Sequence, residues 1–385
     1  MSIPFSPNVS EAARRDILDL ENKISVFTSG NVPEEAFRKF RLARGVYGQR
    51  QAGVQMIRIK LPYGRITADQ LVRIADCSDK YATGNLHATT RQDIQLHFVK
   101  LADSPALWAE LEDANITLRE ACGNTVRNVT ASARAGVDPL EPFDVTSITH
   151  GIFDYFLRNP ICQDMGRKFK IAVSSSEKDS AYAYIHDVGL IPKTQVNENG
   201  KEVKGFKVLV GGGLGAQPLM AQTAHEFLEE QFIIPFIEAV IRVFDRYGER
   251  VRRHKARMKY LLADIGLEEF LSRVKDEQKA LKNKEFAVNT LPFAVDSLYT
   301  STREEGLTKE ELIAQAQDTI YKKWLETNVF EQKQKGWYGV QLRVLLGDMH
   351  SSTARKLADI VRQYAANDIR VTVNQGYLLR FVKAE

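Results

Sequence analysis

The sequence of 385 residues has only three cysteines, Cys77, Cys122 and Cys162, and no two of them lie close together. Such a set predicts neither a disulfide framework nor a complete zinc or iron–sulfur site within the chain. The histidines also suggest no metal site. No run of about 18 apolar residues is present, so no membrane helix is expected. The N-terminus lacks the apolar segment of a secretory signal. The expected compartment is the cytosol.

The chain also lacks a marked excess of either charge, because its formal net charge is only +4. A dedicated nucleic-acid-binding protein usually has an obvious basic excess, so this function is not expected. Hydrophobic residues make up 44% and charged residues 26%, which is typical of a globular protein. Any site for an anion must therefore come from a local concentration of positive charge.

Two segments near the start of the chain resemble two segments near its end. Residues 85–99 match residues 368–382 with an offset of 283 residues, and residues 53–61 resemble residues 339–347. The identities include Thr89 with Thr372, Gln92 with Gln375, Leu96 with Leu379, and Phe98-Val99 with Phe381-Val382. Each unit has the pattern strand, helix, strand. Two unrelated units could match by chance, but identities on both sides of a helix favour a duplicated gene, with one copy opening each half.

The region between the two copies has a mixed α/β pattern. Alternating β-branched and aromatic residues predict strands in residues 168–176, 180–191 and 205–212. An Asn-Gly turn within residues 196–202 predicts that the last two strands form a hairpin.

The segments that follow the hairpin look helical. We expect a helix from Leu219 to Tyr247, kinked or split at Pro235, and another over 249–262. The basic run Arg250 to Lys259 is expected to be a solvated helix face or a surface for an acidic partner. Residues 275–335 are rich in Lys and Glu and are expected to connect the two halves.

Positive charge is concentrated in four short segments, each at a predicted strand or strand end. Arg58 with Lys60, and Lys168 with Lys170, should each share one face of a strand. The other two segments are residues 87–92 and 124–129. A single Arg or Lys on a strand is usually solvated surface, but the four segments together suggest a polyanionic ligand.

The glycine-rich segment 211–216 follows a predicted strand, and its spacing matches a dinucleotide-binding loop. Three observations weaken that interpretation: the strand belongs to a predicted hairpin, Pro218 stands where the helix would begin, and no acidic residue ends a strand about 20 residues later. A tight turn, or a loop that lets the backbone approach a flat ligand, is the alternative.

Taken jointly and in this order, the segments resemble the sirohaem-dependent assimilatory sulfite and nitrite reductases, from about Gly45 to the C-terminus. The markers are IRIKLPYG (57–64), ATTRQDIQLH (88–97), NTVRNV (124–129), GRKFK (166–170) and LVGGGLG (209–215). The resemblance implies an α+β (mixed α/β) fold with duplicated ferredoxin-like strand–helix–strand units and a sirohaem-binding domain. The two units should pair about a pseudo-two-fold axis, and the duplicated segments should touch in space.

The resemblance also implies roles for individual residues. Lys60, Arg127, Lys168 and Lys170 should line the pocket of a small anionic substrate, with Lys168 and Lys170 supplying charge and protons. Arg58, His87 and Arg91 should hold carboxylates of sirohaem, which has eight. The loop from Gly211 to Gly215 should lie along the macrocycle. The remaining residues that the resemblance assigns to the cofactor site are Thr89, Thr90, Gln92, Asn128, Arg167, Asn374 and Gln375.

The chain departs from the family pattern in three places. Lys60 stands where an Arg is usual, and Tyr63-Gly64 replaces Gly-Gly. The four cysteines that hold the family's 4Fe-4S cluster, one of which also bridges to the sirohaem iron, lie in the family beyond the point where this sequence stops. The chain is therefore expected to be a truncated product, an engineered fragment, or one piece of a split enzyme whose C-terminal polypeptide holds the cluster.

The expected reaction is the six-electron reduction of sulfite to sulfide or of nitrite to ammonia, with electrons from ferredoxin or a flavoprotein. Lys170 favours sulfite, because nitrite-reducing relatives tend to have Asn there. A link between Tyr47 and Cys122 beside the haem is a further hypothesis. A fragment that binds sirohaem or a related tetrapyrrole without turnover is the rival interpretation, and an NAD-dependent enzyme is a third.

The expected division of the chain has four parts. An N-terminal segment with the first half-domain spans 1–120, and a sirohaem- and substrate-binding domain spans 121–275. A connector at 276–335 and a truncated second half-domain at 336–385 complete it.

Overall fold

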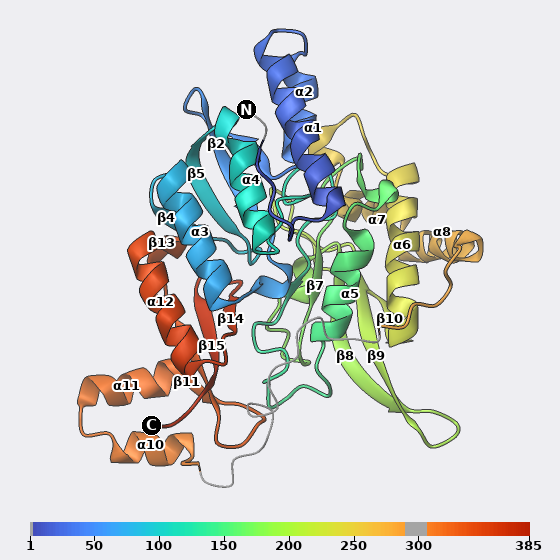
Figure 1. The fold of residues 1–385 in the computed structure, drawn as a ribbon. Helices are drawn as coiled ribbons and strands as arrows, with labels where there is room; N and C mark the ends of the chain where they lie inside the picture. Colours follow the sequence, from blue (N-terminus) through green and yellow to red (C-terminus); the bar gives the residue numbers. More distant parts are fainter. Residues whose placement is uncertain (1–2, 289–305) are drawn as a thin grey trace. The chain divides into compact units, whose positions relative to one another are not determined.

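The computed structural model describes residues 3–288 and 306–385, which form two compact units. The first unit combines residues 3–122 with 306–385, and the second contains residues 123–288. In Figure 1 the first unit therefore joins the blue and cyan segments with the orange and red ones. Within the described residues, no helix is long and apolar enough to cross a membrane.

The first unit contains two five-stranded sheets with equivalent strand orders. One runs in the order β1 (Val46–Gly48), β2 (Val54–Ile59), β5 (Ile94–Lys100), β4 (Asn85–Ala88) and β13 (Asp348–His350). The other runs in the order β11 (Val329–Glu331), β12 (Tyr338–Leu342), β15 (Tyr377–Val382), β14 (Ile369–Val371) and β3 (Arg65–Ile66). Each copy lends its short strand, β13 or β3, to the edge of the other copy's sheet. The expectation that the duplicated segments touch in space is therefore confirmed.

Equivalent turns tie the two copies together. The Gln92 side-chain amide donates to the Val371 carbonyl at 2.9 Å, and the Gln375 amide donates to the Ala88 carbonyl at 3.0 Å. Both glutamines have left-handed backbone angles, with φ of 57° and 63°. The same 283-residue offset relates both partners of each bond. The two glutamines thus form a reciprocal clasp, which gives a structural reason for their presence.

The helices of the first unit are α1 (Glu11–Thr28), α2 (Glu34–Leu42), α3 (Ala68–Tyr81), α4 (Ser104–Asp113), α10 (Lys309–Gln315), α11 (Thr319–Asn328) and α12 (Ser351–Tyr364). Helix α3 begins with a capping box, in which Thr67 and Gln70 satisfy each other's backbone amides. It buries Leu71, Ile74 and Ala75. Its counterpart α12 lies beside it in Figure 1, and Arg355 pairs with Asp76 across the two helices at 2.7 Å.

The second unit contains a mixed sheet with the order β10 (Gln222–Glu229), β9 (Glu202–Val210), β8 (Val188–Val196), β7 (Ile171–Val173) and β6 (Thr130–Ala131). Strands β6, β7 and β8 are parallel, whereas β8, β9 and β10 are antiparallel. The predicted hairpin is confirmed as β8–β9, closed by the bond from Asn197 N to Lys201 O at 2.9 Å. Its helices are α5 (Thr146–Phe156), α6 (Glu230–Tyr247), α7 (Met258–Ile265) and α8 (Leu267–Ala280).

Two sequence-based expectations for this unit are wrong. The segment expected to begin a long helix at Leu219 forms strand β10 first, and α6 begins only at Glu230. Helix α6 continues through Pro235 as a single helix. Because proline has no backbone N–H, it cannot donate to the Gln231 carbonyl, which accepts instead from the Phe286 amide at 2.8 Å. The helix expected over 249–262 begins at Met258, after a 3-10 turn at Arg253–Lys255. Part of the expected connector, residues 289–305, lies outside the described residues.

Candidate polar sites and family membership

A polar row crosses four strands of the first sheet. Arg58 on β2 lies opposite Gln95 on β5, Gln95 lies opposite His87 on β4, and His87 lies opposite Asp348 on β13. The side-chain oxygen of Gln95 faces Arg58 and accepts from its guanidinium at 2.7 and 3.1 Å, and the side-chain nitrogen donates to His97 Nε2 at 3.3 Å. Because residues in register share a face, these side chains lie in one line.

The histidines of this row differ in their surroundings. His87 Nδ1 lies 2.8 Å from Asp348 Oδ1, whereas the His97 ring lies 5.8 Å from the His87 ring. Burial lowers the pKa of His97, and the neighbouring His87 lowers it further. His97 is therefore neutral at pH 7, and Arg58 supplies permanent positive charge on this face.

The turn between β4 and β5 contains four of the predicted cofactor residues. The Thr89 hydroxyl accepts from the backbone amides of Arg91 and Asp93, both at 3.2 Å, and so shapes the turn. Thr90 is exposed and Arg91 is partly buried. Gln92 is fully buried in the clasp with the second copy. In that copy Asn374 and Gln375 occupy the equivalent turn.

Lys60 lies in a buried ion network of the first unit. Its ammonium is 3.8 Å from Glu120, and the two side chains are 2% and 0% exposed. Glu120 is also 3.5 Å from the Arg119 guanidinium, which pairs with Asp16 at 3.2 Å. A buried lysine requires such a carboxylate, because an isolated charge in the interior is very costly. Sequence reasoning missed Glu120, and the role of Lys60 in a substrate pocket stays a prediction.

Three predicted substrate-binding cations share one face in the second unit. Val126 and Phe169 form a parallel bridge, and the Arg127 amide donates to the Phe169 carbonyl at 2.9 Å. Phe169 is fully buried, whereas Lys168 and Lys170 on either side of it are partly exposed. Because side chains alternate along extended backbone, Arg127, Lys168 and Lys170 lie on the face opposite Val126 and Phe169. Asn128 is fully buried, and Arg167 is partly exposed.

The buried carboxylate of Asp187 supports this segment. It accepts from the Lys170 amide at 2.9 Å, and the Arg257 guanidinium donates to both of its oxygens at 2.9 Å. Asp187 is fully buried and Arg257 is largely so. The two residues are 70 positions apart, so no local pattern in the sequence indicates their pairing. Asp187 therefore fixes the backbone from which Lys170 projects.

The glycine-rich loop is shaped by the second unit's own packing. A Cβ atom on Gly211 would lie 2.5 Å from Leu262, and one on Gly212 would lie 2.4 Å from the Tyr184 carbonyl. Lys259, which is 2% exposed, donates to the carbonyls of Gly213 and Leu214 at 3.3 and 3.2 Å. Burial lowers the pKa of Lys259. The basic run is thus no uniform solvated face, because Lys259 points inward.

The dinucleotide interpretation of this loop is wrong. Strand β9 pairs antiparallel with both β8 and β10, and the chain continues after the loop into strand β10. A dinucleotide site requires a parallel strand–loop–helix unit whose helix begins at the pyrophosphate. Two backbone bonds between Gly213 and Leu219, at 2.9 and 3.0 Å, close a short loop between these residues. The contact of Gly211–Gly215 with a macrocycle stays a prediction.

The side chains that the structure describes do not fit an iron–sulfur cluster. Cys77, Cys122 and Cys162 are buried, and none of them forms a disulfide. Burial raises the pKa of Cys77 to about 12, which opposes the thiolate form that ligates metals. Across residues 3–288 and 306–385, no group of three or more His, Cys, Asp or Glu side chains is placed to hold a metal ion. The proposed Tyr47–Cys122 link stays a prediction; Tyr47 is half exposed and Cys122 is buried.

Two models of one protein family match the chain. The model described as the nitrite and sulphite reductase 4Fe-4S domain matches residues 122–282. The model described as the nitrite/sulfite reductase ferredoxin-like half domain matches residues 47–114 and again residues 330–385. The chain belongs to the nitrite and sulphite reductase family. The second model's two matches coincide with the duplicated units, so the expected α+β fold with duplicated ferredoxin-like units is confirmed.

The chain is similar to curated nitrite and sulfite reductases over part of their length. The chain is 29% identical over 372 residues to an assimilatory ferredoxin-dependent nitrite reductase of Haloferax mediterranei, and 30% identical over 349 residues to a chloroplastic ferredoxin–nitrite reductase of Oryza sativa. These matches cover 92% and 87% of the chain but only 60% and 52% of the relatives. A sulfite reductase [ferredoxin] of Mycobacterium tuberculosis is 32% identical over 215 residues, which are 56% of the chain and 38% of that relative.

A solved structure has the same fold as the chain. The structure of the Mycobacterium tuberculosis NirA protein superposes with a TM-score of 0.76 and 22% sequence identity. The match covers 99% of this chain and 67% of the NirA chain. At this identity the likeness describes the fold.

Proposed function

We propose that the chain is the sirohaem- and substrate-binding part of a sulfite or nitrite reductase that carries out a six-electron reduction. Family membership supports the reaction class. The single structural observation that carries the proposal is the bridge between Val126 and Phe169. By strand alternation it directs Arg127, Lys168 and Lys170 to its other face, at a segment where Asp187 accepts from the Lys170 amide. A small oxyanion is the ligand that such a set attracts.

Sirohaem fits the donor chemistry of the residues that we assign to it. A macrocycle with many carboxylates requires several cationic partners, and Arg58, His87 and Arg91 provide guanidinium and imidazole groups. The polar row fixes Arg58 through Gln95 and His87 through Asp348, so both side chains are oriented before a ligand binds. When bound, sirohaem supplies the redox chemistry.

The protein's own residues bind the substrate and move protons. Lys168 and Lys170 offset the negative charge of the substrate and donate protons from their ammonium groups as its bonds to oxygen break. Arg127 holds the anion by its planar guanidinium. Its Nε donates to the Gly123 carbonyl at 3.0 Å, which fixes the direction of the side chain. Asp187 is a positioning residue, because it acts on the substrate only through Lys170 and Arg257.

We propose sulfite as the preferred substrate, with nitrite as the alternative. The proposal depends on Lys170, since a second ammonium beside Lys168 suits a substrate that carries more negative charge. The names of the related proteins include both activities. The protein loaded with sirohaem and an iron–sulfur cluster should therefore reduce sulfite with a higher kcat/KM than nitrite, with reduced viologen as the electron source. Replacement of Lys170 by Asn should shift this ratio toward nitrite by about tenfold or more.

A second candidate function is binding of sirohaem or a related tetrapyrrole without turnover by this chain alone. The buried, separated thiols favour it, because the described residues hold no cluster site. On this proposal another polypeptide segment supplies the 4Fe-4S cluster, and ferredoxin or a flavoprotein delivers the electrons. Sirohaem binding without viologen-dependent turnover would support it. Turnover of sulfite or nitrite by the chain alone would contradict it.

A further inference from the structure

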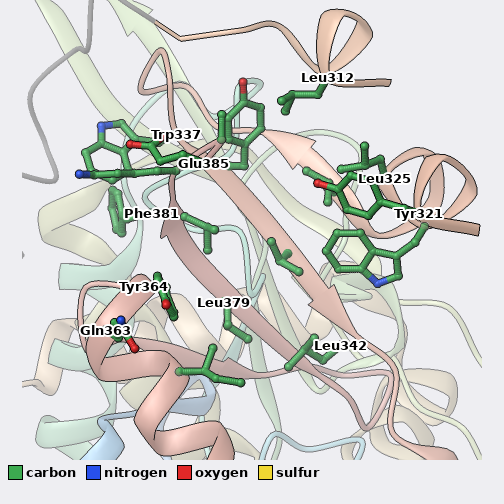
Figure 2. A pocket seen from close by; sticks show the side chains of 18 residues that line it. Leu312, Tyr321, Leu325, Trp337, Leu342, Gln363, Tyr364, Leu379, Phe381 and Glu385 are labelled. Atoms are coloured by element: carbon green, nitrogen blue, oxygen red, sulfur yellow. The ribbon is translucent and has the colours of Figure 1, made fainter. Parts of the chain in front are cut away.

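Two exposed surfaces of the molecule differ in what supports them. The apolar groove of about 730 Å³ over β12, β15 and α12 has the terminal residue Glu385 in its lining (Figure 2), and nothing in the structure shows what covers it. The loop between Gly213 and Leu219 is also exposed, but the group that supports it is buried inside the second unit. The contacts of this loop are therefore set by the chain itself.

The loop encloses a single buried ammonium. Lys259, in the first turn of α7, is 2% exposed. Its Nζ donates to the carbonyl of Gly213 at 3.3 Å, to that of Leu214 at 3.2 Å, and to that of Gln217. Three carbonyl oxygens thus converge on one nitrogen. Because only an ammonium has three N–H groups to donate, this geometry requires the charged form of Lys259.

Few other contacts hold the outer part of the loop. Two backbone bonds between Gly213 and Leu219 close its base. Within the described part of the chain, residues 214–217 form hydrogen bonds only with Lys259 and with Lys255, whose Nζ donates to the Gln217 side chain at 3.3 Å. Backbone carbonyls that face the interior require a partner. The ammonium of Lys259 is therefore the interior group around which the loop is ordered.

The same loop turns its apolar side chains outward. Leu214 is 59% exposed and Met220 is 64% exposed. Gly215 has a φ of 117°, a conformation that favours glycine and reverses the chain here. Carbonyls that point to Lys259 and apolar side chains that point to solvent are thus two sides of one loop conformation. An exposed apolar surface of this kind suits one face of a flat macrocycle.

We propose that Lys259 is a positioning residue for the tetrapyrrole. Its ammonium acts as an internal cation that shapes residues 213–219, and the loop so formed offers its apolar side chains to one face of the macrocycle. Lys259 acts only through the loop, because it is buried beneath it. The inference rests on the proposed function, since it names a residue that prepares the same cofactor site.

The test removes the ammonium and then returns it from solution. Lys259→Ala deletes the outer methylene groups and the ammonium, a gap that propylammonium matches. Lys259→Met keeps most of the side-chain volume without a donor, so it remains informative if the alanine variant misfolds. Lys255→Ala is the matched control, because Lys255 is partly exposed and donates to the Gln217 side chain rather than to the backbone.

Two measurements report on separate steps. Hydrogen exchange of the Gly213 and Leu219 amides reports closure of the loop in the protein without cofactor, and a sirohaem titration followed by visible absorption reports the cofactor site. In both Lys259 variants we expect these amides to exchange about tenfold faster and sirohaem to bind about tenfold more weakly. Lys255→Ala should match the unaltered chain in both measurements.

Propylammonium should restore both values in Lys259→Ala but not in Lys259→Met, where the side chain fills the space. Propanol, which has no charge, should restore neither. Equal rescue by propanol, or no rescue of Lys259→Ala by propylammonium, would show that packing matters rather than charge, and would overturn the proposal.

Two further outcomes would also overturn it. One is an exchange rate and a sirohaem affinity that equal those of the unaltered chain. The other is faster exchange with unchanged affinity, because Lys259 would then support the loop without serving the cofactor. Absence of sirohaem binding to the unaltered chain would contradict the proposed function and with it the cofactor role of Lys259, whereas the exchange rates would still show whether the ammonium orders the loop.

Discussion

The buried carboxylate of Asp368 is the residue whose loss should most weaken the first unit. Three guanidinium groups surround it, from Arg370 at 3.2 Å, Arg380 at 3.4 Å and Arg65 at 3.8 Å. The side chains of Asp368, Arg370 and Arg380 are at most 3% exposed. Replacement of Asp368 by Asn therefore removes the buried carboxylate that faces these three positive charges.

The size of the effect follows from these distances. At an effective dielectric constant of about 20, each pair contributes roughly 4–5 kcal/mol of Coulomb attraction. Much of this attraction offsets the desolvation of the ions, so removal of one partner of a buried pair costs about 3–5 kcal/mol. We expect Asp368→Asn to lower the free energy of unfolding of the first unit by that amount. A second change, Arg370→Gln, should restore part of it because it removes one of the positive charges that Asp368 faces.

Urea unfolding followed by tryptophan fluorescence measures this quantity. All three tryptophans, Trp108, Trp324 and Trp337, belong to the first unit, so the signal reports that unit alone. Asp359→Asn is the matched control, since Asp359 forms an exposed pair with Arg362 and should contribute less than about 0.5 kcal/mol. A loss below 1 kcal/mol for Asp368→Asn, or no recovery with Arg370→Gln, would refute the argument.

The same cluster predicts a dependence on pH. Burial opposes ionisation of Asp368, but Arg370, Arg380 and Arg65 outweigh it and lower the pKa of the carboxyl below its ordinary value. A group with a lowered pKa in the folded state adds stability above its unfolded pKa, near 3.9. We therefore expect this contribution to be constant from pH 7 to about pH 5 and to disappear as the pH falls below 4. In Asp368→Asn the contribution should be absent at every pH.

Two further predictions concern the second unit. Lys168→Met and Lys170→Met should each lower kcat/KM for the anionic substrate by about 100-fold in the loaded enzyme, because each removes a charge beside the substrate. The control Lys207→Met, at a surface pair with Glu226, should change kcat/KM less than twofold. Equal effects of all three changes would contradict the assignment. Gly212→Ala should destabilise this unit by more than about 2 kcal/mol, because a Cβ atom would overlap the Tyr184 carbonyl. Gly200→Ala should cost only about 1 kcal/mol, because a Cβ atom there would meet only the strain of a left-handed backbone. Circular dichroism during urea unfolding measures the difference, and similar losses of stability in the two variants would refute this prediction.

The duplication was predictable from sequence because it leaves identical residues where the fold requires them. Gln92 and Gln375 must reach a carbonyl of the other copy from a left-handed turn, so few substitutions are acceptable. The alternation around Phe169 likewise predicted that Lys168 and Lys170 share a face, and their partial exposure on either side of a buried ring agrees with it.

Other features depend on contacts between distant residues, which local patterns do not contain. Strand β10 lies at a sheet edge with two register shifts and no fully buried residue, so its sequence lacks a clear strand alternation. Lys259 looks like a surface cation because its carbonyl partners lie more than 40 positions earlier. Asp187 and Glu120 are acids that only the folded chain places against Arg257 and Lys60.

The most direct test of the central claim, that this chain's cations bind a carboxylate-rich tetrapyrrole, is a sirohaem titration followed by visible absorption. We expect one sirohaem per chain, bound at least tenfold more weakly after Arg58→Gln, since a charge-assisted hydrogen bond contributes about 1.5–3 kcal/mol. The surface control Arg355→Gln should bind as tightly as the unaltered chain. Absence of binding to the unaltered chain, or equal affinities of the two variants, would contradict the account.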